Sequence, residues 1–229
     1  MPQTVFRAIL FAFAFASFSH AFEEEWVKKY AFAAGMDFVL GKGDFNGKSQ
    51  IYSRDLEESI ILPKIPFFLV YVFEARALAN ASSIIGSMGL GYPEYKHSLQ
   101  NGDARYLRLG IEYQYHFFWP SDFRIGLGVG YAFSSMRFSK ASIVRSDDEW
   151  DFENGDWSYA NFTGNGAHAV LSFDYYFSEN FAAECGFRYR LLHLNRVATD
   201  RDPPNDVSKL NSAVLQHLGE LGLKFMFVF

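Results

Sequence analysis

Charged side chains recur at every second position within several apolar segments, and they are the residues whose types and spacing could carry chemistry. Equal numbers of acidic and basic residues share this pattern: Asp37, Glu74, Glu112, Asp174, Glu184 and Glu220 against Arg76, Arg108, Arg124, Arg188, Arg190 and Lys224. Clustered carboxylates beside His116 or His168 could perform acid–base work or pass protons. We favour a structural ion-pair network, because ion pairs also produce such clusters and unpaired buried charges are costly.

The elements that must position these charges are predicted to be β-strands. A period of two, with apolar residues on one face and charged, polar or small residues on the other, is the signature of strands. The last segment shows it clearly, because its odd positions from Leu215 to Phe229 are mostly apolar and its even positions include Gln216, Glu220 and Lys224. Eight such segments are predicted: 30–41, 67–76, 84–92, 107–117, 123–133, 168–177, 181–191 and 215–229.

The connections between these segments alternate in length. Short turns are predicted near 79–82, 119–122 and 178–180, and long polar loops at 42–64, 93–104, 139–165 and 195–212. Even strand number, short periplasmic turns and long external loops are the features of an outer-membrane barrel. The predicted fold class is therefore all-β: an eight-stranded antiparallel up-and-down transmembrane β-barrel.

Aromatic residues gather at the turn end of the predicted strands, as in the girdles of membrane barrels. The outward residues at that end are Tyr30, Phe32, Tyr115, Phe117, Phe123, Tyr175, Phe177, Phe181, Phe227 and Phe229. A soluble sandwich or lipocalin-like barrel buries its apolar face and does not predict this clustering.

The composition argues against three other classes: disulfide-linked proteins, nucleic-acid-binding proteins and helical membrane proteins. A single cysteine, Cys185, allows no internal disulfide, and a net charge of −5 provides no basic footprint for nucleic acid. The most apolar later stretch, IILPKIPFFLVYVF, is broken by Pro63, Lys64 and Pro66, so it is no transmembrane helix. Any membrane span must consist of strands.

The first 21 residues, MPQTVFRAILFAFAFASFSHA, are predicted to be a secretory signal peptide. Arg7 precedes an apolar run that is too short to span a bilayer, and Ser19 and Ala21 form a small-residue cleavage site. The mature barrel would occupy residues 22–229.

Three other motifs are interpreted as structural. GKGDFNGKS at 41–49 resembles a P-loop but has Lys42 where the first glycine is needed, and it lies in a loop. GLGVGY places glycines on the inner face of a strand, where they make room for opposing side chains. The acidic stretch SDDEWDFENGDW lacks the spacing of a calcium-binding loop. No metal site and no cofactor are predicted.

Over the whole mature chain, the sequence resembles the small outer-membrane β-barrel superfamily of OmpX-like and OmpA-barrel-like proteins. GFRYR in the seventh strand, followed by a loop and a final strand that ends in Phe229, is typical of those chains. The resemblance implies that the terminal aromatic row, Phe225, Phe227 and Phe229, is the signal read by the barrel-assembly machinery. It says little about activity, since members include stability proteins, adhesins, channels for small hydrophobic molecules and lipid-modifying enzymes.

A local resemblance supports an alternative hypothesis, in which the barrel is an enzyme. RYRLLHLNRVATDRDPPND, residues 188–206, is similar to PagL-like lipid A deacylases, in which a His-x-Ser-Asn-Ala run ends the penultimate strand. The resemblance implies His193 as the base and Asp206 as a candidate orienting acid. Asn195 stands where the family has its nucleophilic serine, and Arg196 stands where it has asparagine. Without a hydroxyl at position 195 the covalent route is lost.

The functional hypothesis is an integral outer-membrane protein of a Gram-negative bacterium, with a filled, charged lumen and a structural or surface-interaction role. Its expected partners are outer-membrane lipid, lipopolysaccharide and the barrel-assembly machinery, with no nucleic acid. The alternative is a lipid A deacylase or a degenerate relative of one. A third class, a channel for small hydrophobic molecules, needs a less charged lumen.

Overall fold

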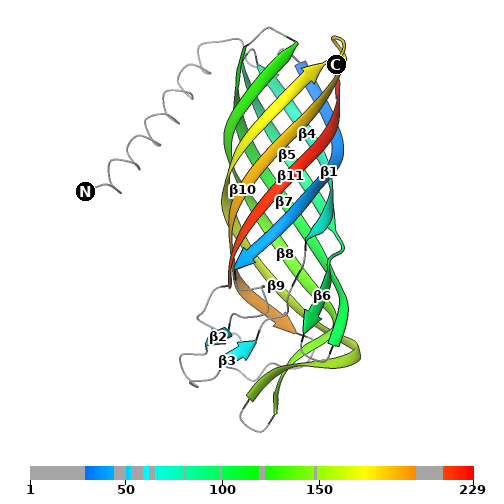
Figure 1. Cartoon of the computed structure of the whole chain (residues 1–229), viewed down its shortest axis with the longest axis vertical. Helices are drawn as coiled ribbons and strands as arrows, with labels where there is room; N and C mark the ends of the chain where they lie inside the picture. Colours follow the sequence, from blue (N-terminus) through cyan, green and yellow to red (C-terminus); the bar gives the residue numbers. More distant parts are fainter. Residues whose placement is uncertain are drawn as a thin grey trace, which may run out of the picture.

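The computed structural model contains eight long strands that close into a barrel (Figure 1). The residues described are 29–43, 50–52, 59–61, 65, 67–79, 81–97, 100–118, 122–146, 149–199 and 214–229. Within them, the backbone alone is described at 42–43, 50–52, 59–61, 96–97, 100–101, 140–146, 149–158, 195–199 and 214–215. The predicted signal peptide lies outside the described residues.

The eight barrel strands are antiparallel to their neighbours. They are β1 (Lys29–Gly43), β4 (Phe68–Ala79), β5 (Ser82–Gly91), β7 (Gln100–Phe117), β8 (Phe123–Ser146), β9 (Glu149–Tyr176), β10 (Phe181–Thr199) and β11 (Val214–Val228). The hydrogen-bonded order is β5-β4-β1-β11-β10-β9-β8-β7, and a β5–β7 pairing closes it. The first and last strands are therefore neighbours, paired from Ala31↔Val228 to Gly43↔Gln216. The predicted fold class is confirmed.

The two ends of the barrel differ. One end carries the C-terminus, the start of β1 and the turns that join β4 to β5, β7 to β8 and β9 to β10 (Figure 1). The other carries three short strands, β2 (Gln50–Tyr52), β3 (Ser59–Ile61) and β6 (Glu94–His97). By the rule that short turns face the periplasm, we call the first end periplasmic and the second extracellular.

The predicted loops at 139–165 and 93–104 were too long, and the structure corrects them. The β8–β9 ladder continues to Ser146↔Glu149, with one irregularity between Ser139 and Ala141. Strand β6 pairs with the start of β7 over the second predicted loop. A ladder needs only a partner backbone, so strands joined by a hairpin can extend beyond the bilayer even where their side chains are polar or charged.

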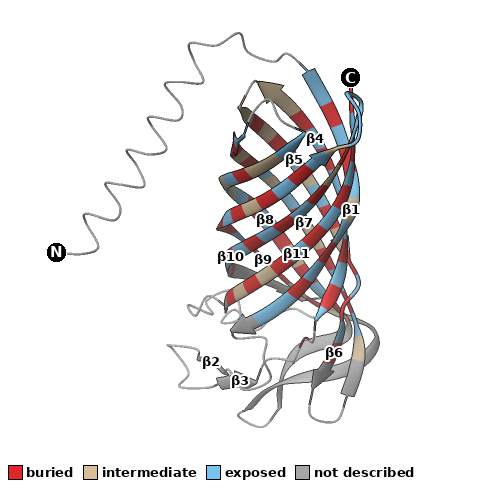
Figure 2. Cartoon of the chain, turned by 45° about the horizontal axis from the view of Figure 1, so that its top comes forward, coloured by how far each residue is buried: buried red, intermediate tan, exposed pale blue. Residues whose placement is uncertain are grey.

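Alternation along the strands separates the exterior from the interior, visible as stripes in Figure 2. In β4, buried and exposed positions alternate from Phe68 to Arg76. The outward positions are large and apolar, and all ten residues of the predicted aromatic girdle are exposed. A band of exposed apolar side chains around a closed barrel is the surface that a bilayer covers.

The interior is layered along the barrel axis. The inward positions of β11 run from Val228 and Met226 at the periplasmic end, through Lys224 and Glu220, to Leu218 near the extracellular end. Apolar side chains therefore lie on both sides of a charged layer. Gly130 of β8 faces this layer, and a Cβ there would collide with the imidazole of His168. The glycines of GLGVGY thus give room to larger neighbours.

Candidate functional site

The charged layer is built around Glu184 of β10. Its carboxylate accepts hydrogen bonds from Arg76 at 2.6 Å, from Lys224 at 2.9 Å and from Arg188 at 3.4 Å. Glu74 lies beside it and is ion-paired with Arg76, with Lys224 at 2.7 Å and with Arg188 at 3.6 Å. Two carboxylates and three cations thus form one buried cluster, in which each carboxylate is neutralised by several partners.

A second cluster surrounds Arg108 of β7. Its guanidinium donates to Asp37 of β1 at 2.8 Å and to Glu220 of β11 at 2.7 Å. Arg190 of β10 lies 3.2 Å from the other oxygen of Glu220. All four side chains are 2% exposed or less. These contacts connect the β7 wall with strands on the far side of the barrel.

Glu112 of β7 joins the first cluster to a row of hydrogen-bonding side chains. Arg188 donates to it at 2.9 Å, and the imidazole of His168 lies 2.8 Å from the same oxygen. The Gln114 amide also donates to Glu112, and the Ser172 hydroxyl donates to Gln114 at 3.0 Å. Sequence reasoning did not name Gln114 or Ser172 as network members, although their inward positions on β7 and β9 are the signal that could have found them.

Nearer the periplasmic end, Ser83, His116 and Asp174 are arranged in the order of a hydrolase triad. The Ser83 hydroxyl is 2.9 Å from Nε2 of His116, and Nδ1 is 3.3 Å from an Asp174 oxygen without hydrogen-bond geometry. Ser83 is 2% exposed, so a substrate carbonyl has no approach to its oxygen in this structure. Arg124 stacks over the Tyr176 ring at 3.8 Å and is the one predicted lumen charge that is only partly buried.

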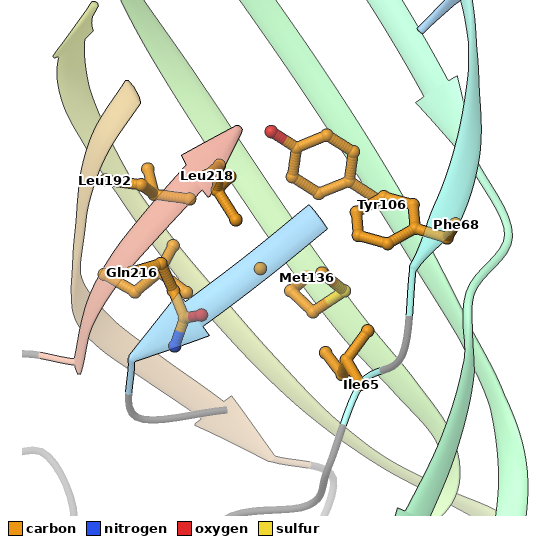
Figure 3. Close-up of a pocket in the computed structure, with 9 residues that line it drawn as sticks. Ile65, Phe68, Tyr106, Met136, Leu192, Gln216 and Leu218 are labelled. Carbon is orange, nitrogen blue, oxygen red and sulfur yellow. The ribbon is translucent and has the colours of Figure 1, made fainter. Parts of the chain in front are cut away.

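Above the charged layer, toward the extracellular end, the interior becomes apolar and contains a cavity (Figure 3). We call this cavity the upper chamber; its volume is about 20 Å³, room for about one water molecule. Its lining residues are Gly41, Ile65, Phe68, Tyr106, Met136, Leu192, Leu194, Gln216 and Leu218. The charged inward positions of the sequence gave no sign of this cavity, because its lining residues carry no charge.

Of the residues proposed for the alternative enzyme, His193 is the one whose side chain the structure describes. His193 is exposed on the outer face of β10, and its partners on the neighbouring strands are Asn165 and Leu215. Asp206 and the side chains of Asn195 and Arg196 lie outside the described residues. The imidazole therefore faces outward, away from the lumen.

The terminal aromatic row lies on the outer face of β11, with Phe225, Phe227 and Phe229 all exposed. The Phe229 backbone exchanges two hydrogen bonds with Tyr30, at 2.9 and 3.0 Å. Its ring stacks on Tyr30 and Phe32 of β1. The last residue thus takes part in the seam between the first and last strands.

In the described part of the chain, no helix is long and apolar enough to cross a bilayer. No three His, Cys, Asp or Glu side chains in these residues are grouped as metal ligands would be.

Comparisons with known proteins agree with this architecture. No protein-family model matches the sequence, and no curated protein matches it. The structure is similar to Neisserial surface protein A, with a TM-score of 0.54, 14% identity, and coverage of 86% of this chain and 96% of that one. It is also similar to OprG from Pseudomonas aeruginosa, with a TM-score of 0.54, 12% identity, and coverage of 90% and 98%. This chain is therefore an eight-stranded barrel that shares the fold of these outer-membrane proteins.

Proposed function

We propose that this chain is an integral outer-membrane barrel whose lumen is sealed, and whose role is structural or carried by its extracellular surface. The observation that carries the proposal is the set of ion pairs that cross the lumen. Arg108 on β7 reaches Glu220 on β11, which lies across the barrel with three strands between them. Arg188 on β10 reaches Glu112 on β7, with two strands between them.

The cross-lumen contacts act as a plug because an eight-stranded barrel is only wide enough for side chains to fill it. An ion that entered from the periplasm would have to displace paired charges and strip them of their partners. That step is costly in a buried layer. Apolar side chains such as Val228 and Met226 below the layer, and Leu218 above it, add a second barrier to water and ions.

The sealed lumen predicts that the refolded protein shows no steady conductance in planar lipid bilayers. The control is the double variant Glu112→Ala/Arg188→Ala, which removes one complete cross-lumen pair and should introduce brief, small openings. Large, well-resolved open levels in the unmodified protein would contradict a sealed interior. Indistinguishable records from both proteins would show that this ion pair does not contribute to the barrier.

The extracellular end supplies the surface for interaction, since β8 and β9 continue there as a long hairpin. Outer-membrane lipid and lipopolysaccharide are the proposed neighbours of the apolar exterior. No catalytic step is assigned, because the outward His193 has Asn165 and Leu215 as its strand partners and Ser83 is buried.

The terminal row is the proposed contact for the barrel-assembly machinery, and Phe229→Ser is expected to lower the yield of folded protein in the outer membrane. The change removes the ring that stacks on Tyr30 and Phe32, at the end of the outward aromatic row. Heat-modifiable migration of membrane fractions measures the folded population. Phe118→Ser is the control, because Phe118 is an exposed aromatic in a periplasmic turn outside this seam.

Refolding both variants in vitro separates assembly from stability. The assembly proposal expects Phe229→Ser to refold into lipid vesicles like the unmodified protein and to be deficient only in cells. Normal accumulation of folded Phe229→Ser in cells would refute the proposal.

A further inference from the structure

We propose that two arginines on the outer face of the barrel, Arg105 of β7 and Arg137 of β8, bind a phosphate group of a lipid in the outer leaflet. The proposal rests on the function proposed above, in which lipid covers the apolar exterior, and it adds a defined headgroup site to that surface. We call the two side chains the arginine pair. They lie directly opposite each other in the β7–β8 ladder, and both are exposed.

The arrangement of the arginine pair is unfavourable without an anion. Side chains directly opposite each other on antiparallel strands have Cβ atoms about 4.5–5.5 Å apart, and like charges at such positions destabilise a sheet. Within the described ranges, neither arginine forms an ion pair with a carboxylate. Asp103 and Glu94 are exposed farther toward the extracellular side, where they lie opposite each other in the β6–β7 ladder. An anion between the two guanidinium groups would remove the repulsion.

An aromatic ring positions one member of the pair. The guanidinium carbon of Arg137 lies 4.2 Å from the centre of the Tyr159 ring on β9, which is a cation–π geometry. Stacking uses the flat face of the guanidinium and leaves the N–H groups at its edge to donate to an oxyanion. Arginine binds phosphate through two parallel hydrogen bonds of this kind. The pair therefore offers directed donors that suit a phosphate.

The depth of the arginine pair places it beside lipid headgroups. Arg105 lies twelve residues from Phe117, a residue of the periplasmic girdle on β7. Arg137 lies fourteen residues from Phe123, a residue of the same girdle on β8. A tilted strand crosses the hydrocarbon in about 9–11 residues. Both arginines are therefore just outside the hydrocarbon, on the extracellular side.

The outer face below the arginine pair matches the rest of a lipid. Leu109 and Phe133 lie opposite each other, four residues along each strand toward the periplasm, and both are exposed. Leu107 and Ser135 form the pair between them and the arginines. An apolar surface thus leads to two cations about 13 Å away, at about 3.3 Å per residue. A lipid can contact both parts of this face, whereas a soluble anion can contact only the arginines.

Titration of the protein in dodecyl maltoside micelles tests the proposal in the absence of other phosphate groups. The probe is lipid A, compared with the same lipid after removal of its phosphates, and isothermal calorimetry measures binding. The unmodified protein is expected to bind the phosphorylated lipid saturably. The dephosphorylated lipid should bind at least about tenfold more weakly, a ratio that corresponds to 1.4 kcal/mol. Equal affinities would overturn the proposal, because acyl contacts alone would then account for binding.

Charge-removing variants assign the binding to the arginine pair. Arg105→Gln/Arg137→Gln should weaken binding of lipid A at least about tenfold. Lys29→Gln is the matched control and should bind like the unmodified protein, because Lys29 is an exposed cation at the periplasmic end. Heat-modifiable migration establishes that each variant is folded, and Arg137→Gln alone takes the place of a double variant that does not fold. Unchanged binding in the arginine variant, or equal losses in the arginine and lysine variants, would refute the site.

Two further titrations identify what the arginine pair recognises. Inorganic phosphate at the same concentration is expected not to displace lipid A, and displacement would indicate a site for soluble anions and overturn the lipid assignment. Titration of lipid A in EDTA removes divalent cations, which could connect its phosphates to Asp103 and Glu94. Binding that persists in EDTA supports direct contact with the arginines. Binding that is lost in EDTA would assign the contact to the carboxylates and refute the proposal.

Arginine in place of Leu223 distinguishes failure of this site from failure of the proposed function. Leu223 is exposed on the outer face of β11. If Leu223→Arg destabilises the barrel in bilayers but the two lipids bind equally, hydrocarbon covers the exterior and the phosphate site alone is wrong. If Leu223→Arg is tolerated as well, the lipid-covered exterior is also wrong.

Discussion

Replacing Glu184 with leucine is expected to lower the free energy of unfolding of the barrel by about 3–5 kcal/mol. The carboxylate is buried and is contacted by Arg76, Arg188 and Lys224. Glu74 and, through Arg188, Glu112 remain to neutralise this cluster, so two carboxylates then face three cations. The cost arises from the stranded positive charge more than from the lost attraction, because a charge without a partner is strongly disfavoured in the interior.

Urea titration of the protein refolded in bilayers measures this loss, and Cys185→Ala is the matched control. Cys185 follows Glu184 on β10 and is exposed on the outer face, so its truncation changes the same strand without touching the network. We expect the control to stay within about 1 kcal/mol of the unmodified protein, as is usual for sites away from buried features. Equal stability of Glu184→Leu and Cys185→Ala would show that the cluster is not energetically coupled.

Adding Lys224→Met to Glu184→Leu tests whether the unpaired positive charge causes the loss of stability. The double variant removes one of the three cations left around Glu74, so it should recover part of the stability lost by Glu184→Leu alone. Such a recovery would measure an interaction free energy between Lys224 and Glu184, as is expected for two residues in contact. Strictly additive losses would indicate that Lys224 is stabilised by Glu74 independently of Glu184.

The faces of the strands could be predicted from the sequence because alternation depends only on local geometry. Leu223 faces outward and Lys224 inward, as the period of two requires. The partners of the inward charges could not be predicted in the same way. Arg108 meets Glu220 across the lumen, between strands that are not neighbours, and this meeting depends on the stagger of all eight ladders.

The upper chamber was missed for a different reason. Inward positions were recognised by charge, and the chamber's inward residues carry none. The signal was present in the run LLHL, residues 191–194, where Leu191 faces lipid while Leu192 and Leu194 face the interior. Apolar residues at consecutive positions, such as Leu191 and Leu192, indicate a strand buried on both sides. In a membrane barrel it marks the depth at which the lumen is apolar.

The ends of the strands were the least predictable feature. Charge and glycine suggested a loop at 139–165, yet backbone pairing continues through most of it. By contrast, β4 begins at Phe68, two residues after Pro66 in the sequence, and a proline has no N–H to donate to a ladder. A strand end caused by proline is local and can be predicted from the sequence. The length of a hairpin depends on pairing with the partner strand and cannot be predicted in this way.

Arginine at Leu223 is expected to destabilise the barrel by about 2–4 kcal/mol, the cost of a basic side chain on the lipid face near the bilayer midplane. Leu223 is 54% exposed on the outer face of β11. A tilted strand crosses the hydrocarbon in about 9–11 residues, so counting inward from the girdle at Phe229 places Leu223 close to the middle. Leu127 lies four residues from Phe123 on β8, as Leu223 does from Phe227 on β11, and is expected to behave alike.

Two matched changes separate membrane burial from other effects of arginine in the same urea titration. Glu179→Arg alters an exposed periplasmic turn in water and should change stability little. Gly128→Arg should prevent folding for a steric reason, because a Cβ at Gly128 would already collide with the Tyr113 carbonyl. If Leu223→Arg and Leu127→Arg were tolerated as well as Glu179→Arg, the outer face would not be in hydrocarbon.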